Sequence, residues 1–187
     1  MTRCMIGALK GKAAVITGGG SGIGKSMVER YLAEGASVVA ADINEASLKA
    51  LLEELEPEYG DKLKILKVNV SSKEEVEAMI DYTVEAFGKV DVVINNAGIL
   101  DNLLPIAEMP DDVWERIMNI NLNSVMYACR KAVQYFLKEK REGTIINTAS
   151  LSGLCAGRGG LAYTTSKFAV VGLTKNVAFM YSDAGIR

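Results

Sequence analysis

The stretch Ala13-Ala14-Val15-Ile16-Thr17-Gly18-Gly19-Gly20-Ser21-Gly22-Ile23-Gly24 decides the fold. Its apolar first part predicts a strand, and the residues that follow predict a helix over Gly22–Glu34. A glycine pattern alone is a weak indication, but a strand before it and a helix after it are typical of a dinucleotide-binding loop. Without Cβ atoms the backbone can approach a pyrophosphate, which the free N–H groups of the helix start attract. We therefore expect a dinucleotide to contact Gly18, Ser21, Gly22, Ile23 and Gly24.

Asp42 follows the second expected strand. A carboxylate at this place can accept hydrogen bonds from an adenosine ribose. The same carboxylate would repel a 2′-phosphate, and the loop Gly18–Gly24 holds no Arg or Lys to offset it. NAD is therefore expected in preference to NADP. The alternative interpretation is that Asp42 caps the next helix, and Lys25, just past the loop, is expected to be solvated.

Short β-branched runs alternate with longer helical patterns along the whole chain. The expected strands are Ala13–Thr17, Ser37–Ala41, Leu63–Val70, Val90–Asn95 and Gly143–Ala149. The expected helices are Gly22–Glu34, Glu45–Leu55, Lys73–Phe87, Asp112–Glu139 and Tyr163–Ser182. Alternation of this kind predicts an α/β protein with a doubly wound parallel sheet, Rossmann-like, in the strand order 3-2-1-4-5. We expect residues 1–187 to form a single dinucleotide-binding and catalytic domain.

Composition excludes several classes of function. The 187 residues include no histidine, which excludes a Ser-His-Asp triad and a His-ligated metal, and no metal site is expected. A net charge of −2 gives no basic surface for nucleic acid or for an anionic membrane. Cys4, Cys129 and Cys155 are expected to be free thiols of a reduced, cytoplasmic protein. No run approaches the roughly 18 apolar residues of a membrane span.

Ser150, Tyr163 and Lys167 form a candidate catalytic set. Tyr163 and Lys167 are four residues apart at the start of a helix, so they project from one face. A phenol ordinarily has a pKa of about 10 and is a poor base at pH 7. A neighbouring ammonium and the positive end of a helix both favour the phenolate, which offers acid/base chemistry without histidine. Ser150 ends the fifth expected strand and can donate a hydrogen bond to a substrate oxygen.

The motifs occur in an order that resembles the short-chain dehydrogenases/reductases, and the resemblance covers the whole chain. The matching segments are TGGGSGIG at Thr17–Gly24, NNAG at Asn95–Gly98, Asn121 within Asn119–Leu122, Ser150, and the YxxxK of Tyr163–Lys167, with Ser150 thirteen residues before Tyr163. Any one match is weak, but five in order are specific. Asn119 and Asn123 are neighbours of Asn121, and Ser152 is the nearby alternative to Ser150.

The resemblance implies roles for these residues. Tyr163 would be the general acid/base, and Lys167 would assist it and hold the nicotinamide ribose. Ser150 would polarise the carbonyl, and Asn121 would hold a water that relays protons. Around the adenine, the resemblance places Asn96, Ala97 and Gly98 together with Asn69 and Val70. Asn69 stands where the family often has Asp, and its amide is expected to accept from the adenine amino group.

The implied activity is hydride transfer between NAD(H) and a secondary alcohol or ketone. The family members that the sequence most resembles are 3-oxoacyl-carrier-protein reductases and carbonyl or sugar dehydrogenases. A reductase of the first kind that uses NADPH is one alternative, and a catalytically inactive nucleotide-binding scaffold or fragment is another. Leucines suggest a partly apolar substrate pocket, namely Leu104, Leu151, Leu154 and Leu161.

Two further expectations concern assembly and length. The helices over 112–139 and 163–182 are apolar on more than one face, which favours a homodimer or homotetramer formed through them. The last residues, Ala184–Arg187, look like a turn into a sixth strand. A doubly wound fold commonly has six strands, so the chain is expected to lack its last strands at the C-terminus.

Overall fold

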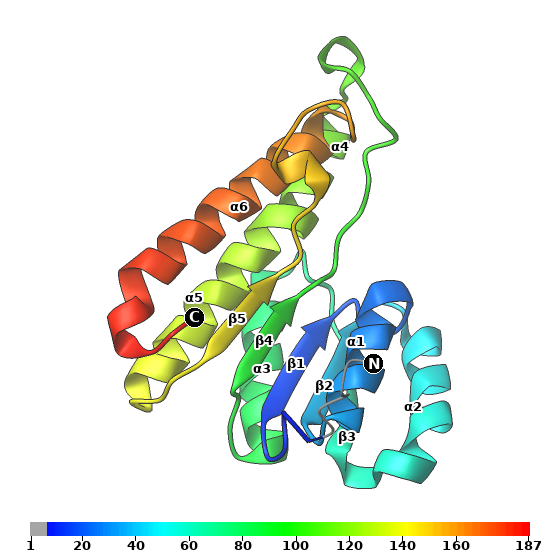
Figure 1. The fold of residues 1–187 in the computed structure, drawn as a ribbon. Coiled ribbons are helices and arrows are strands. Elements are labelled where there is room, and N and C mark those ends of the chain that lie inside the picture. The colour runs from blue at the N-terminus through cyan, green and yellow to red at the C-terminus, as the bar shows by residue number, and fades with distance from the viewer. Residues whose placement is uncertain (1–6) are drawn as a thin grey trace, which may run out of the picture.

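The computed structural model describes residues 7–187, and its centre is a five-stranded parallel sheet (Figure 1). The strands are β1 (Ala13–Thr17), β2 (Ser37–Asp42), β3 (Leu63–Lys67), β4 (Val92–Asn95) and β5 (Thr144–Asn147). Their order is β3-β2-β1-β4-β5, which confirms the predicted topology. The registers pair Val15 with Val39 on one side and with Val93 on the other. A ligand site is therefore expected at the point where the strand order reverses, beyond the carboxyl ends of β1 and β4.

Helices cover both faces of the sheet. One face packs against α1 (Gly22–Ala33) and α2 (Glu45–Tyr59), and the other against α3 (Lys73–Phe87) and α5 (Ser124–Lys138). Successive side chains of β1 point to opposite faces of the sheet. Ile16 lies in the hydrophobic cluster with α1, and Val15 lies in the hydrophobic cluster with α3 and α5. Strands buried on both sides need near-continuous apolar sequence, which is the pattern that predicted them.

The prediction of a single long helix over 112–139 is wrong. The structure has α4 (Asp111–Met118), a π-helical turn (Asn119–Asn123) and then α5. The side chain of Asn121 is fully buried and forms hydrogen bonds with Ile99 and Ser166, which lie outside this helical segment. These contacts accompany the extra residue that the π turn contains. π turns of this kind are frequent at functional sites.

The remaining boundaries differ from the predictions in smaller ways. β3 ends at Lys67 rather than Val70, because the Asn69 side chain accepts from Ser71 N–H at 3.1 Å and starts a turn into α3. α2 runs on through Pro57 to Tyr59 instead of stopping at Leu55. Short 3₁₀ helices lie at Gly60–Lys62, Ile106–Glu108, Leu151–Gly153 and Ser182–Ala184.

The last long helix, α6 (Leu161–Tyr181), lies alongside α5 (Figure 1). Val170 of α6 packs against Val125 and Cys129 of α5. Burial raises the pKa of the Cys129 thiol to about 11, whereas Cys155 is exposed; Cys4 lies outside the described residues. Both described cysteines are free, as predicted.

After α6 the chain turns back toward the sheet beside β5. Ile186 is buried and forms a parallel bridge with Gly143, and Arg187 N–H donates to the Gly143 carbonyl at 2.9 Å. The expected turn into a position beside the fifth strand is therefore present. No helix within residues 7–187 is long and apolar enough to cross a membrane.

Candidate active site

A cleft of about 870 Å³ lies over the carboxyl ends of the strands. Every expected cofactor-binding residue lines it, together with Ser150, Tyr163 and Lys167. The cofactor-binding set is Gly18, Ser21, Gly22, Ile23, Gly24, Asp42, Asn69, Val70, Asn96, Ala97 and Gly98. The sequence analysis missed the other lining residues, which are Ile43, Val68, Ile99, Leu100, Ile120, Thr148 and Ala149. Most of these residues are sequence neighbours of a motif residue, and this proximity was the one signal in the sequence that could have identified them.

The glycine loop is shaped by close backbone approach. Gly18 has φ +66°, and a Cβ there would lie 3.2 Å from the Cα of Ala97. A Cβ at Gly24 would overlap the carbonyl oxygen of Gly18. The loop is thus wound tightly onto the start of α1, where the Ser21 side chain makes no capping bond to the helix among the described residues. The first residues of α1, Gly22, Ile23 and Gly24, line the cleft, and uncapped N–H groups at a helix start are the donors that pyrophosphate binding uses.

Asp42 forms a hydrogen bond with this loop and does not cap a helix. Its carboxylate accepts from the Gly20 N–H at 3.0 Å and from the Asn44 N–H at 2.9 Å. The cap of α2 is Asn44, whose side chain accepts from Ser47 N–H, so the alternative interpretation of Asp42 is wrong. Each carboxylate oxygen keeps a lone pair for a ribose hydroxyl.

Lys25 is not simply solvated. Its ammonium pairs with Glu54 at 2.6 Å and with Glu29 at 3.8 Å. The hydrogen bond to Glu54 is the main reason that the pKa of Lys25 is raised. Glu29 lies on α1 and Glu54 on α2, so these ion pairs hold the Lys25 ammonium between the two helices.

Thr17 joins the glycine loop to the NNAG segment. Its hydroxyl accepts from Asn96 N–H at 2.9 Å and from Ala97 N–H at 3.1 Å, and its carbonyl accepts from the Asn96 side chain. The Asn96 oxygen in turn accepts from the Thr148 hydroxyl at 3.3 Å. The ends of β1, β4 and β5 are therefore connected through neutral side chains, and the role of Thr17 was not foreseen.

Asn69 does not present its oxygen to the cleft as expected. Both the N–H and the hydroxyl of Ser71 donate to it, at 3.1 and 2.7 Å. A carbonyl oxygen has two lone pairs, so the expected acceptance from an adenine amino group is not available in this arrangement. Its amide NH₂ remains a possible donor.

Lys167 is nearly buried below the Tyr163 ring. Its ammonium lies 5.7 Å from the ring centroid and donates to the Thr148 carbonyl at 2.8 Å. Burial lowers the pKa of Lys167, which makes its proton easier to transfer. The spacing of four residues on α6 therefore produces the predicted neighbouring pair.

Ser150 lies three residues beyond β5, at the N-cap of the 3₁₀ helix Leu151–Gly153, and lines the cleft. Its hydroxyl oxygen accepts from Ser152 N–H at 3.1 Å, a contact that leaves the hydroxyl hydrogen for a substrate oxygen. Ser152 is 1% exposed and does not line the cleft. The geometry therefore favours Ser150 over the alternative Ser152.

Asn121 lies behind the cleft wall. Its side chain accepts from Ile99 N–H and donates to the Ile99 carbonyl, both at 2.9 Å, and it donates to the Ser166 hydroxyl at 3.2 Å. Ser166 donates to the Tyr163 carbonyl at 2.7 Å. Asn121 thus connects the segment after NNAG with the helix that carries Tyr163, while Asn119 and Asn123 bond to each other.

This geometry agrees with the comparison with known proteins. The family model described as "short chain dehydrogenase" matches residues 12–187. The chain therefore belongs to the short-chain dehydrogenase family, NAD(P)-dependent oxidoreductases that act on CH–OH groups.

Three relatives mark its place in that family. The chain is 68% identical over 179 residues to "3beta-hydroxysteroid dehydrogenase 2" of Eggerthella lenta, covering 96% of this chain and 68% of the relative. It is 38% identical to the "3beta-hydroxysteroid dehydrogenase" of Mediterraneibacter gnavus, covering 97% and 65%. A crystal structure of a short chain dehydrogenase from Mycobacterium smegmatis superposes with a TM-score of 0.91 at 37% identity, covering 97% and 75%. The chain spans about two thirds of the length of these curated relatives.

Proposed function

We propose that the protein oxidises a secondary alcohol with NAD, or reduces the matching ketone with NADH, and that the alcohol is the 3β-hydroxyl of a steroid. The observation that carries the chemistry is one cleft that holds the glycine loop, Asp42 and the set Ser150, Tyr163 and Lys167. The steroid class rests on the two relatives named as 3β-hydroxysteroid dehydrogenases.

The protein's own part is orientation and proton transfer. The dinucleotide, when bound, supplies the hydride acceptor or donor. In the oxidation, the Tyr163 phenolate takes the hydroxyl proton while the carbon-bound hydrogen leaves with its electron pair, so that a ketone remains. Ser150 donates to the same oxygen, and Lys167 stabilises the phenolate with its charge. In the reduction the same proton returns from Tyr163 to the substrate oxygen.

Asn121 has a positioning part in this proposal. Its side-chain amide is hydrogen-bonded to Ile99 and Ser166, so a relay water would have to use the second lone pair of Asn121 Oδ1.

We prefer NAD over NADP as the cofactor. Asp42 lies in the cleft as a fixed acceptor, and a carboxylate attracts ribose hydroxyls but repels a 2′-phosphate. Lys25, just past the glycine loop, is held by Glu54 and Glu29. The next residue, Ile43, is apolar and 62% exposed, and it offers a phosphate no donor beyond its backbone N–H.

The cleft mouth suits an apolar substrate. Several large aliphatic side chains on the segments after β4 and β5 are highly exposed, and they are Leu100, Leu103, Ile106, Leu151 and Leu154. Leu100 lines the cleft, and exposed aliphatic residues on the segments that continue from a cleft are typical of a surface that contacts an apolar ligand. An alicyclic skeleton with a single hydroxyl fits this chemistry better than a charged sugar.

The deciding experiment follows the formation or consumption of reduced cofactor, NADH or NADPH, by the purified full chain. The panel is a 3β-hydroxysteroid, its 3α epimer and cyclohexanol with NAD or NADP, and a 3-oxoacyl thioester with NADPH. We expect turnover of the 3β epimer with NAD. Preference for the thioester would favour the carrier-protein reductase alternative, and a folded, NAD-binding protein inactive on the whole panel would contradict the proposal.

Asp42→Asn tests the cofactor preference. The amide keeps one acceptor for the Gly20 loop but loses the negative charge, so the ratio of kcat/KM for NAD over NADP should fall by about ten-fold or more. Glu85→Gln, which removes an exposed carboxylate on α3, is the matched control and should leave the ratio unchanged. An unaltered ratio in Asp42→Asn would count against the ribose contact.

We also propose that the chain self-associates through α5 and α6, as a homodimer or homotetramer in the cytoplasm. A groove of about 370 Å³ lies between these helices, lined among others by Val133, Leu137, Leu173 and Val177. Phe179 is 82% and Met180 61% exposed. Light scattering that gives the monomer mass at micromolar concentration would contradict this part.

A further inference from the structure

Asp101 is a buried carboxylate outside every motif. It follows the NNAG segment by three residues and is 1% exposed. Its two oxygens accept backbone hydrogen bonds from across the chain, from Gly160 N–H at 3.1 Å and from Tyr163 N–H at 2.8 Å. Asp101 therefore binds the first turn of α6, the helix that carries Tyr163 and Lys167.

This first turn has no cap of its own. The N-cap position is Gly160, whereas Asn44 caps α2 and Ser72 caps α3 with their own side chains. The N–H groups at a helix start need acceptors from elsewhere when the N-cap residue supplies none. The loop after β4 supplies them, because Leu161 N–H also donates to the Leu104 carbonyl at 3.0 Å.

The same loop holds an unfavourable backbone shape. Asn102 and Leu103 have φ of +57° and +61°, and an aliphatic residue rarely adopts this left-handed region. A long hydrogen bond of 3.4 Å from Leu104 N–H to the Asp101 carbonyl closes the turn. Strained backbone persists where its surroundings fix it, and here both ends of the turn are bonded to α6.

Gly160 and Asp101 are in close contact. A Cβ built on Gly160 would overlap the carboxylate of Asp101. Gly160 has φ −70°, a value that any residue adopts, so its small size and not its backbone freedom admits the carboxylate.

We propose that Asp101 is a positioning residue for Tyr163: it acts as an N-cap in trans that fixes the first turn of α6, and with it the phenol, relative to the cofactor loop. This inference rests on the proposed acid/base role of Tyr163. A displacement of about 1 Å at a reacting group can cost on the order of 10²-fold in rate. Leu100, directly before Asp101, lines the cleft.

The contact has an electrostatic side as well. A carboxylate at a helix N-terminus neutralises part of the positive end of the helix. Near Tyr163 it therefore opposes the phenolate, whereas Lys167, whose ammonium lies 5.7 Å from the ring centroid, favours it. Loss of the charge with retention of the fold should move the acid limb of the pH profile of kcat/KM to lower pH.

Three variants of the full chain test the proposal. Asp101→Ala removes both acceptors, Asp101→Asn keeps one and removes the charge, and Gly160→Ala pushes the intact carboxylate away. We expect kcat to fall by about ten-fold or more in each, while the Kd for NADH stays within about three-fold, because the glycine loop is untouched. In Asp101→Asn the acid limb should also shift as described.

Glu34→Gln is the matched control. Glu34 is likewise nearly buried and accepts two backbone N–H groups, from Gly7 at 2.8 Å and Ala8 at 3.0 Å, but at the far end of α1 from the cleft. It should leave kcat unchanged. Wild-type kcat in Asp101→Asn and Gly160→Ala would overturn the proposal, and so would losses matched by Glu34→Gln with no shift of the acid limb. A Tyr163→Phe variant that stays active would instead overturn the proposed function itself.

Discussion

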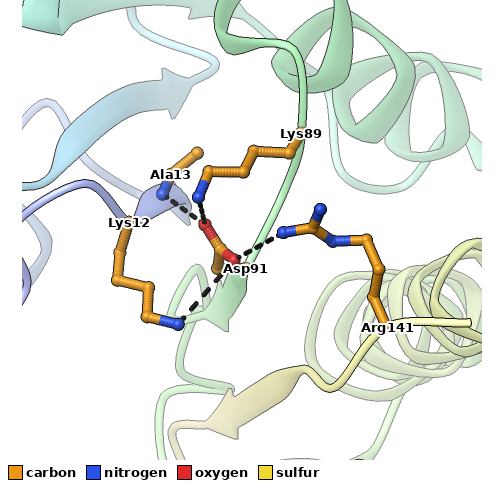
Figure 2. Close-up of polar contacts among 5 residues, drawn as sticks. All are labelled: Lys12, Ala13, Lys89, Asp91 and Arg141. Carbon is orange, nitrogen blue, oxygen red and sulfur yellow. Dashed lines mark hydrogen bonds and ion pairs between the residues drawn. The ribbon is translucent and has the colours of Figure 1, made fainter. Parts of the chain in front are cut away.

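The two ends of the sheet are held together by different chemistry. At the carboxyl ends, around the cleft, the strands are joined by hydroxyl and amide groups, chiefly Thr17, Asn96 and Thr148. At the amino ends a single carboxylate, Asp91, gathers charged partners (Figure 2). The comparison indicates that ion pairs join neighbouring strands at their amino ends, whereas neutral hydrogen bonds join β1, β4 and β5 at their carboxyl ends.

The Asp91 cluster joins three strands. The Asp91 carboxylate accepts from Ala13 N–H at 2.9 Å, and it pairs with Lys89 at 3.1 Å, Arg141 at 3.2 Å and Lys12 at 3.9 Å (Figure 2). Burial alone would raise the pKa of Asp91, but the bond from Ala13 and the ammonium groups of Lys89 and Lys12 outweigh it and lower the pKa. The carboxylate is therefore fully ionised at neutral pH.

The difference follows from what each end has to do. A cofactor with a pyrophosphate needs N–H groups that point into the cleft, and a dense carboxylate cluster there would repel it. Nothing in the proposed chemistry uses the amino ends, so strong charged contacts can be placed there at no cost to binding.

Among these variants, Asp91→Ala should lower the free energy of unfolding most while leaving kcat unchanged. Removal of a 7%-exposed carboxylate leaves Ala13 N–H without its acceptor and three cations facing each other, so the free energy of unfolding should fall by about 2 kcal/mol. Urea denaturation followed by circular dichroism measures it. The kcat of the folded fraction should not change, and Asp81→Ala, which removes an exposed partner of Lys131, should have little effect on either. Undiminished stability in Asp91→Ala would contradict the role of the cluster.

The stabilisation by Asp91 should depend on pH with a defined sign. Because the pKa in the folded protein lies below the unfolded value of about 3.9, the contribution is complete above that value. It is lost as pH falls through the folded-state pKa. The stability difference between wild type and Asp91→Asn should therefore be constant from pH 7 to about pH 5 and shrink below about pH 4. A difference that widened in acid would refute this sign.

Thr17→Val should give a smaller effect at the opposite end. Valine keeps the shape but leaves Asn96 N–H and Ala97 N–H without their acceptor, at about 1 to 2 kcal/mol. Because these groups line the cleft, we expect the loss to appear mainly as a weaker affinity for NADH, measured by fluorescence titration. Thr83→Val, which removes a hydroxyl bonded within α3, is the control. Unchanged affinity for NADH in Thr17→Val would contradict the claim that the hydrogen bonds at the carboxyl ends of the strands support cofactor binding.

The sequence predicted the strand order and the composition of the cleft because both follow from local patterns. Apolar runs, glycine spacing and the interval between Ser150 and Tyr163 are all readable along the chain. The π turn at Asn121 was not predictable, since it depends on bonds to Ile99 and Ser166. Asp101 and Thr17 were missed for the same reason: each acts on backbone groups more than sixty residues away, and an isolated Asp or Thr carries no periodic signal.

The most direct test of the account is a paired measurement on Tyr163→Phe. The ring and its contact with Lys167 remain, and only the phenolic oxygen is lost. With a 3β-hydroxysteroid and NAD, the account predicts a fall in kcat of about 10³-fold or more, with the Kd for NADH within about three-fold of wild type. Turnover near the wild-type rate, in a variant that binds NADH normally, would contradict the central claim that Tyr163 carries the proton.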